Sequence, residues 1–218
     1  MLRKPIPIDL LILDFDGTIT DSIPPAVEAI QKMIKRLGLP YKTKEEINKH
    51  VGYGEMPLLK GATGSKDPVL LKKAMDVYED IYVKEGFKKV TLYPHVKEFL
   101  EYFRDKTKVI LSNKKDDFIK RILDIHNLAG YFAEVHGGDT SPCLKPDPCA
   151  INGIIAKYNI PKDRVLFIGD MTVDIETGKN ANVRTCAVAY GFDDKEKLKG
   201  LNPDLLIDDL MELKDLIE

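Results

Sequence analysis

A short apolar run near the N-terminus, Ile8–Leu13, constrains the fold more than any other feature of this chain. It is apolar at every position except Asp9, and it is too short for a globular helix. Such a run, closed by a turn that contains Gly17, is typical of a strand buried on both faces of a parallel sheet. Asp14 and Asp16 follow it directly, at the end of the strand where open α/β sheets bind ligands. Because buried carboxylates are costly without a compensating cation or hydrogen bonds, the run also predicts a site for a hard ion such as Mg²⁺.

The second half of the chain repeats this pattern of short strands, each followed by a helix. Apolar runs predict strands at residues 108–111, 133–136, 165–168, 185–189 and 205–207. Helical periodicity predicts helices at residues 94–105, 116–126, 172–182 and 211–217, and one more that Asp147 caps and Pro148 starts. This alternation predicts a doubly wound α/β fold, a parallel sheet covered by helices on both faces with right-handed crossovers.

Residues from about 20 to 88 differ, because their pattern is helical with no strand. A helix is introduced at residues 22–25 and ended by Gly38, a capping box at residues 43–46 starts a second, and Asp67-Pro68 opens a longer one. A helical bundle within an α/β chain indicates an insertion. We therefore expect a catalytic core made of residues 1–19 and 91–218, and a small helical cap domain over residues 20–90.

Composition narrows the class of protein. The 218 residues carry a formal net charge of -2, which argues against a surface for nucleic acid or for anionic membranes. Pro5, Pro7 and Asp9 interrupt any apolar core of a signal peptide, and no apolar run approaches the ~20 residues of a membrane span. The three cysteines are odd in number and lack Cys-x-x-Cys spacing, so we expect reduced thiols, Cys143 among them, in a cytoplasmic protein.

Polar groups follow four of the predicted strands, and the carboxyl ends of parallel strands meet at one edge of a sheet. The groups are Asp14 with Asp16, Ser112 with Asn113, Lys145, and Asp170 with Asp174. Several carboxylates, one ammonium and a hydroxyl suit a divalent metal and a phosphoryl group.

Four motifs in this order resemble those of the haloacid dehalogenase-like hydrolase superfamily, in its phosphoglycolate phosphatase-like group with a helical cap after the first motif. They are Asp14-Phe15-Asp16-Gly17-Thr18, Leu111-Ser112-Asn113-Lys114, Lys145-Pro146-Asp147-Pro148 and Gly169-Asp170-Met171-Thr172-Val173-Asp174. The resemblance covers essentially the whole chain. It implies a Rossmann-like catalytic core and phosphoryl transfer through an aspartyl-phosphate.

The resemblance also implies a role for each acidic residue. Asp14 is expected to be the nucleophile, and Asp16 the general acid and base. Asp14, the backbone carbonyl of Asp16 and Asp170 are expected to hold Mg²⁺. Asp174 is expected to orient a water on the metal, or Lys145, from behind these ligands.

The remaining roles that the resemblance implies concern the phosphoryl group and the cap. Ser112 is expected to bind the phosphoryl oxygens with Asn113 and Thr18 nearby, and Lys145 to pair with both Asp14 and the phosphate. Contacts from the cap to the substrate are expected in the glycine-rich break between two cap helices, at Gly52, Tyr53 and Glu55.

Asp16 bears on the reaction, because relatives that cleave carbon–halogen or carbon–phosphorus bonds lack an aspartate at that position. A small phosphomonoester such as 2-phosphoglycolate is therefore the expected substrate, with pyrophosphate or a short sugar phosphate as alternatives. A sugar-phosphate mutase keeps this aspartate, but the cap segment Val51–Pro57 offers no arginine to hold a second phosphate. A non-catalytic protein that binds Mg²⁺ or phosphate is a further alternative, and the chain is expected to be a monomer or a homodimer.

Overall fold

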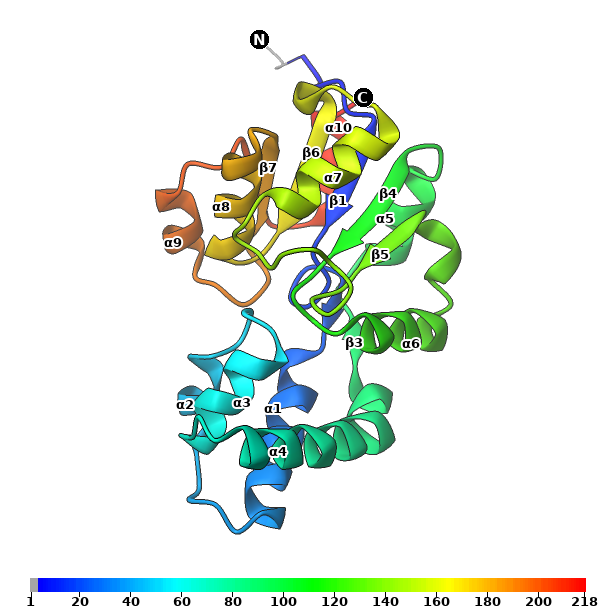
Figure 1. Ribbon diagram of the computed structural model, residues 1–218. Helices are drawn as coiled ribbons and strands as arrows, with labels where there is room; N and C mark the ends of the chain where they lie inside the picture. The colour runs from blue at the N-terminus through cyan, green and yellow to red at the C-terminus, as the bar shows by residue number, and fades with distance from the viewer. Residues whose placement is uncertain (1–3) are drawn as a thin grey trace.

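A computed structural model describes residues 4–218, and its centre is a six-stranded sheet with the order β5-β4-β1-β6-β7-β8 (Figure 1). Every neighbouring pair of strands is parallel. The strands are β1 (Leu10–Leu13), β4 (Thr107–Leu111), β5 (Glu134–His136), β6 (Val165–Gly169), β7 (Arg184–Val188) and β8 (Leu205–Ile207). The predicted parallel α/β sheet is thus confirmed.

Strand β1 is buried on both faces, as its apolar sequence predicts. Leu11 and Leu13 belong to one hydrophobic cluster, and Leu10 and Ile12 to another on the opposite face. This division follows from the alternation of side chains along a strand. Strand β1 pairs with β4 on one side and with β6 on the other, so the loops that follow these three strands are neighbours.

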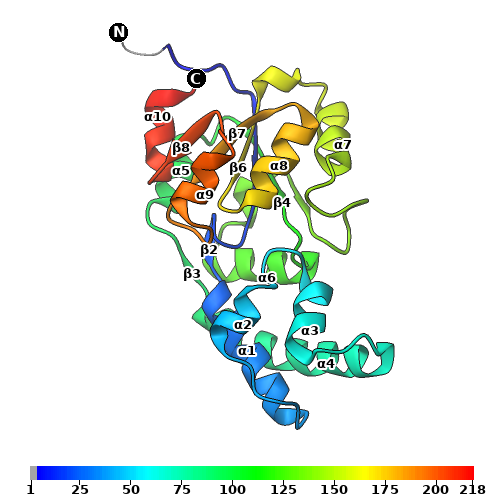
Figure 2. The same ribbon diagram turned by 90° about the vertical axis from the view of Figure 1, so that its left-hand side faces the viewer.

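Helices cover both faces of the sheet, as Figure 2 shows. Side chains of α5 (Val96–Tyr102), α6 (Asp116–His126) and α10 (Leu213–Leu216) share the cluster of Leu11, and those of α7 (Cys149–Tyr158) share the cluster of Leu10. Ala181 of α8 (Thr172–Ala181) also belongs to the second cluster, and α9 (Lys195–Gly200) packs through Leu198 on Ile175 of α8. A doubly wound arrangement follows.

The segment after the first motif is helical and lies beyond the carboxyl ends of the strands (Figure 1). It contains α1 (Ile23–Arg36), α2 (Lys44–Asn48), α3 (Glu55–Thr63), α4 (Pro68–Ile81), a π-helical turn (Tyr82–Gly86) and a 3₁₀ turn (Phe87–Lys89). The predicted capping box at the start of α2 is present, with Thr43 and Glu46 bonding each other's backbone N–H. Because its buried side chains continue into the cluster of Leu11 and Leu13, the division into separate core and cap domains stays a prediction.

Three local predictions were wrong. The cap segment was predicted to contain no strand, but it begins with β2 (Thr20–Asp21). This strand pairs antiparallel with β3 (Thr91–Leu92) where the chain enters and leaves the cap. The helix predicted at 94–105 is shorter, since His95 precedes α5 in a left-handed conformation with φ of 57°. Asp147 does not cap α7, because the helix begins after Pro148, and Asp147 Oδ1 instead accepts the backbone N–H of Cys149 at 2.9 Å.

Among the described residues, no helix is both long enough and apolar enough to cross a membrane.

Candidate active site

Three carboxylates meet at the edge of the sheet that faces the cap. Asp14 follows β1, Asp170 follows β6, and Asp174 lies in the first turn of α8. Carboxylate oxygens of the three residues all lie within 4.8 Å of one another, and all three side chains are buried. The structure thus brings together acidic residues from distant parts of the chain, since Asp14 and Asp174 are 160 positions apart. Parallel pairing of β1 with β6 explains the meeting of Asp14 and Asp170, because Asp14 N–H donates to Ile168 O and prolongs the ladder.

Lys145 supplies the positive charge next to these carboxylates. Its Nζ lies 2.7 Å from Asp14 Oδ1 and donates to Asp174 Oδ1 at 2.6 Å. Asn113 holds the loop that carries Lys145, because its Oδ1 accepts the Lys145 N–H at 2.9 Å and its Nδ2 donates to Lys145 O at 3.3 Å. The Asn113 amide is therefore engaged with backbone groups, Gly52 O included. Asn113 also lines the cavity described below, and its place near the phosphoryl group stays a prediction.

Asp170 is fixed by bonds to both of its oxygens. Thr18 Oγ1 donates to Oδ1 at 3.0 Å, and the Phe192 N–H donates to Oδ2 at 2.8 Å. Thr18 is fully buried and outside the cavity described below, where it supports a carboxylate, and its place near the phosphoryl group stays a prediction. Gly17 adopts a φ of +85°, and a Cβ there would lie 2.0 Å from Asp170 Oδ2. The glycine of the first motif is therefore needed for the close approach of the two loops.

Asp16 lies beside the buried carboxylates but points to a different cation. Lys114 Nζ donates to both of its oxygens at 3.1 Å, and the Ser22 hydroxyl also donates to its Oδ1. Sequence reasoning assigned no role to Lys114, although it follows Ser112 and Asn113 in the second motif. Its place in the turn after β4, at the carboxyl edge of the sheet, was the available signal.

A cavity with a volume of about 60 Å³ lies between the sheet and the cap. It brings together residues of the motifs with an apolar wall from the cap. Its lining includes Asp14, Asp16, Ser112, Asn113, Lys114 and Lys145 from the sheet side, and Ile23, Ala26, Val27, Val51, Gly52, Glu55, Leu58 and Tyr78 from the cap.

Two of the three cap residues predicted to contact the substrate line this cavity, and the third does not. Gly52 and Glu55 line the cavity, whereas Tyr53 does not and is 45% exposed. Glu55 Oε1 accepts the Lys115 N–H at 3.0 Å, which ties the start of α3 to the start of α6. Burial raises the pKa of Glu55, against the opposing charge of Lys114.

The comparison with known proteins decides the family. A profile described as haloacid dehalogenase-like hydrolase matches residues 11–188, which is most of the chain. The chain belongs to the haloacid dehalogenase-like hydrolases. The predicted family is thus confirmed.

Relatives in sequence and in structure agree with this family. The chain is 32% identical over 219 residues to a phosphoglycolate phosphatase of Vibrio parahaemolyticus, with 96% of each chain covered. It is 30% identical to a phosphoglycolate phosphatase of Nitrosococcus oceani, which covers 100% of this chain and 98% of the relative. A crystal structure of a predicted phosphoglycolate phosphatase from Haemophilus somnus matches with a TM-score of 0.89 at 24% identity, over 95% and 96% of the two chains. That structural likeness supports the fold.

The acidic cluster of this hydrolase carries more negative charge than its own side chains balance. Burial raises the pKa of Asp170, and the charges of Asp174 and Asp14 raise it further. Burial likewise raises the pKa of Asp14 to about 6, although Lys145 opposes this shift. Lys145 Nζ pairs with Asp14 Oδ1 at 2.7 Å and with Asp174 Oδ1 at 2.6 Å. Three clustered carboxylates facing one ammonium fit a divalent cation with oxygen ligands.

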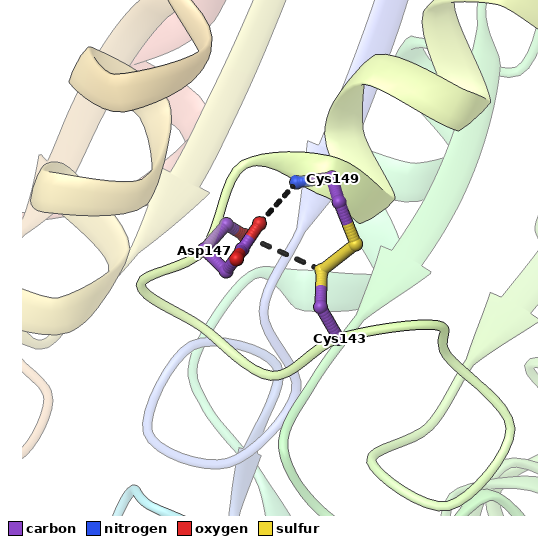
Figure 3. A group of neighbouring side chains, drawn as sticks. All are labelled: Cys143, Asp147 and Cys149. Atoms are coloured by element: carbon purple, nitrogen blue, oxygen red, sulfur yellow. Dashed lines mark hydrogen bonds between the residues drawn. A yellow bond between two sulfur atoms is a disulfide. The ribbon is translucent and has the colours of Figure 1, made fainter.

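The expectation of reduced thiols was wrong for two of the three cysteines. A disulfide joins Cys143 to Cys149 (Figure 3). Cys186 is free and buried. The Cα atoms of the two bonded cysteines are 6.2 Å apart, within the usual range for a disulfide, because the loop between them turns back on itself. Sequence spacing did not reveal the pair, since two cysteines six residues apart match no metal or redox motif. The disulfide closes the loop that carries Lys145.

This disulfide is expected to stabilise the fold by closing a short loop. Replacing both Cys143 and Cys149 with Ser should lower the free energy of unfolding by about 2 kcal/mol, the loop-closure entropy of so short a ring. Because Asn113 still holds Lys145, activity at 25 °C should change little. Urea titrations of the wild type with and without dithiothreitol provide the measurement, and the double variant should be insensitive to the reductant. A wild type with the same midpoint in both conditions would contradict this role.

Proposed function

We propose that this hydrolase is a Mg²⁺-dependent phosphatase that acts on a small phosphomonoester through an aspartyl-phosphate, with 2-phosphoglycolate as the first candidate. The observation that carries the proposal is the position of Asp14. Its carboxylate lies with Asp170 and Asp174 beside Lys145, and it lines a cavity that Asp16 also lines. The relatives named as phosphoglycolate phosphatases support the choice of substrate.

In the first half of the reaction, a carboxylate oxygen of Asp14 attacks phosphorus in line with the ester oxygen. The new bond joins Asp14 to phosphorus, and the bond from phosphorus to the leaving oxygen breaks. Asp16 gives its proton to that oxygen, so the ester oxygen departs as a neutral hydroxyl group. Lys145 and the Ser112 hydroxyl, both in the cavity lining, bind phosphoryl oxygens on which charge develops.

In the second half, Asp16 acts as a base. It removes a proton from a water molecule as the water oxygen bonds to phosphorus, and the bond between Asp14 and phosphorus breaks. Asp14 is restored as a carboxylate, inorganic phosphate leaves, and Asp16 is protonated for the next turnover. The apolar cap wall, with Val27 and Leu58, limits access of other water molecules to the intermediate.

The cation proposed for the cluster is Mg²⁺, held by Asp14, Asp170 and the backbone carbonyl of Asp16. When bound, it neutralises charge on the phosphoryl oxygens. Asp174 supports this arrangement from behind, because its two oxygens are engaged by Lys145 Nζ and by the Met171 N–H. Asp174 is thereby proposed to orient Lys145.

The cavity favours hydrolysis of a small ester over isomerisation of a sugar phosphate. The residues that line it include no arginine to hold the second phosphate that a sugar-phosphate mutase must bind. A small phosphorylated metabolite is therefore the proposed partner.

The cytoplasmic location expected from the sequence is kept as a proposal, although disulfides are rare in that compartment. Alkylation of the cysteines in intact cells, followed by mass spectrometry, tests it.

A substrate screen tests the proposed function. Purified protein with Mg²⁺ is expected to release phosphate from 2-phosphoglycolate faster than from hexose phosphates or pyrophosphate, and EDTA should abolish the release. Excess Mg²⁺ added after EDTA should restore it, which separates metal removal from unfolding. A protein that hydrolyses no phosphomonoester with Mg²⁺ would favour the non-catalytic alternative. Isomerisation of a hexose phosphate that depends on a bisphosphate activator would favour the mutase.

A further inference from the structure

A buried ammonium, that of Lys114, lines the cavity without taking part in the reaction steps above. Its side chain is only 5% exposed, although lysine is among the residues least often buried. Among the residues that line the cavity, Lys114 and Lys145 are the two cations, and Lys145 is committed to Asp14 and Asp174. Lys114 instead pairs with Asp16, and is therefore the cation placed to meet a different part of the substrate.

The position of Lys114 relates it to the leaving group. Its Nζ lies 3.1 Å from both oxygens of Asp16, the carboxyl group that must reach the ester oxygen. An atom attached to that oxygen must therefore lie close to Lys114. In 2-phosphoglycolate the carboxylate is separated from the ester oxygen by one methylene group, so the two anionic ends of this substrate are close together.

The Lys114 ammonium is held by polar groups from both sides of the cavity. On the sheet side, both carboxylate oxygens of Asp16 accept its hydrogen bonds at 3.1 Å. The Tyr82 hydroxyl, from the cap, accepts a hydrogen bond from Nζ at 3.2 Å, and Nζ lies 5.0 Å from the centre of the Tyr82 ring. The ammonium is thus held between the sheet and the cap, where the leaving group must sit.

We propose that Lys114 is a specificity-determining residue whose ammonium binds a carboxylate carried by the leaving group, next to the ester carbon. This inference rests on the proposed function. It predicts that the enzyme selects phosphomonoesters of short hydroxy acids over neutral alkyl phosphates of the same size. Glu55 is the acidic cap residue in the same cavity, and its Oε1 is engaged by the Lys115 N–H at 3.0 Å.

A matched pair of substrates tests this role. Ethyl phosphate has the heavy-atom chain of 2-phosphoglycolate without the carboxylate oxygens, so the ratio of the two kcat/KM values isolates recognition of the carboxylate. We expect the wild type to prefer 2-phosphoglycolate, and Lys114→Met to reduce that ratio by ~10- to 100-fold, the scale of one charge-assisted hydrogen bond. Lys114→Arg, which keeps the charge, should retain most of the preference.

The neighbouring lysine provides a control. Lys115 Nζ pairs with Glu79 at 2.6 Å and does not line the cavity, so Lys115→Met should leave the ratio unchanged. If Lys114 serves only to position Asp16, then Lys114→Met will slow both substrates by one factor, and the constant ratio will overturn the proposal. A wild type that hydrolyses both esters equally well would also overturn it while leaving the phosphatase function intact. A wild type that hydrolyses neither would instead contradict the proposed function itself.

Discussion

Replacing Asp14 with Asn is expected to reduce phosphatase activity by more than ~10⁴-fold, because an amide cannot attack phosphorus and form the acyl phosphate. The variant should fold normally. Burial raises the pKa of Asp14, so its charged form is held at a cost that the neutral amide does not carry. The thermal midpoint of Asp14→Asn should therefore equal or exceed that of the wild type when both are measured without metal.

Asp117→Asn provides the matched control for this experiment. Asp117 is an exposed residue of α6 that pairs with Arg121 at 3.4 Å, so the same chemical change should leave kcat unaltered. Steady-state phosphate release from 2-phosphoglycolate measures both variants. Equal rates for Asp14→Asn and the wild type would refute the assignment of the nucleophile, whereas an unfolded variant would refute only the expectation about stability.

Replacing Asp16 with Asn is expected to lower kcat by ~10²- to 10⁴-fold, the usual contribution of a general acid and base. The loss should depend on the leaving group. An alkyl phosphate needs a proton on its ester oxygen, whereas p-nitrophenolate is stable as an anion and leaves without one. The variant should therefore lose less activity toward p-nitrophenyl phosphate than toward ethyl phosphate, provided that formation of the acyl phosphate limits both rates.

Single-turnover measurements of phosphorylation separate this step from the later attack of water. Ser22→Ala is a useful companion variant, since the Ser22 hydroxyl donates to Asp16. Removing this hydroxyl should lower kcat much less than removing the carboxyl group of Asp16. If Asp16→Asn slows both esters by the same factor in the phosphorylation step, Asp16 does not protonate the leaving oxygen. The loss would then reflect its pairing with Lys114.

Features with strong local patterns could be predicted from the sequence. The apolar run of β1 is buried on both faces, and the order of strands places the loop of Asp14 between those that follow β4 and β6. Because parallel strands bring their carboxyl ends to one edge, the meeting of Asp14 and Asp170 followed from topology alone. These parts of the site depend on backbone geometry that short motifs encode.

Features that depend on side-chain direction could not be predicted. Thr18 turns toward Asp170, and Asn113 turns toward the backbone of Lys145, although each motif alone is compatible with a phosphoryl ligand. Lys114 was missed because its partners, Asp16 and Tyr82, come from distant parts of the chain. The Cys143–Cys149 bond closes the loop that carries Lys145, and no spacing rule describes the path of that loop.

The central claim is that Asp14 carries the phosphoryl group during turnover. Rapid mixing of the wild type with 2-phosphoglycolate and Mg²⁺, followed by acid quenching within the first turnover and peptide mapping by mass spectrometry, tests it directly. The account predicts a phosphorylated peptide in which the modification maps to Asp14 and disappears as turnover is allowed to finish. Phosphate release in the first turnover with no modified Asp14 at any time, or with the phosphoryl group on another residue, would contradict it.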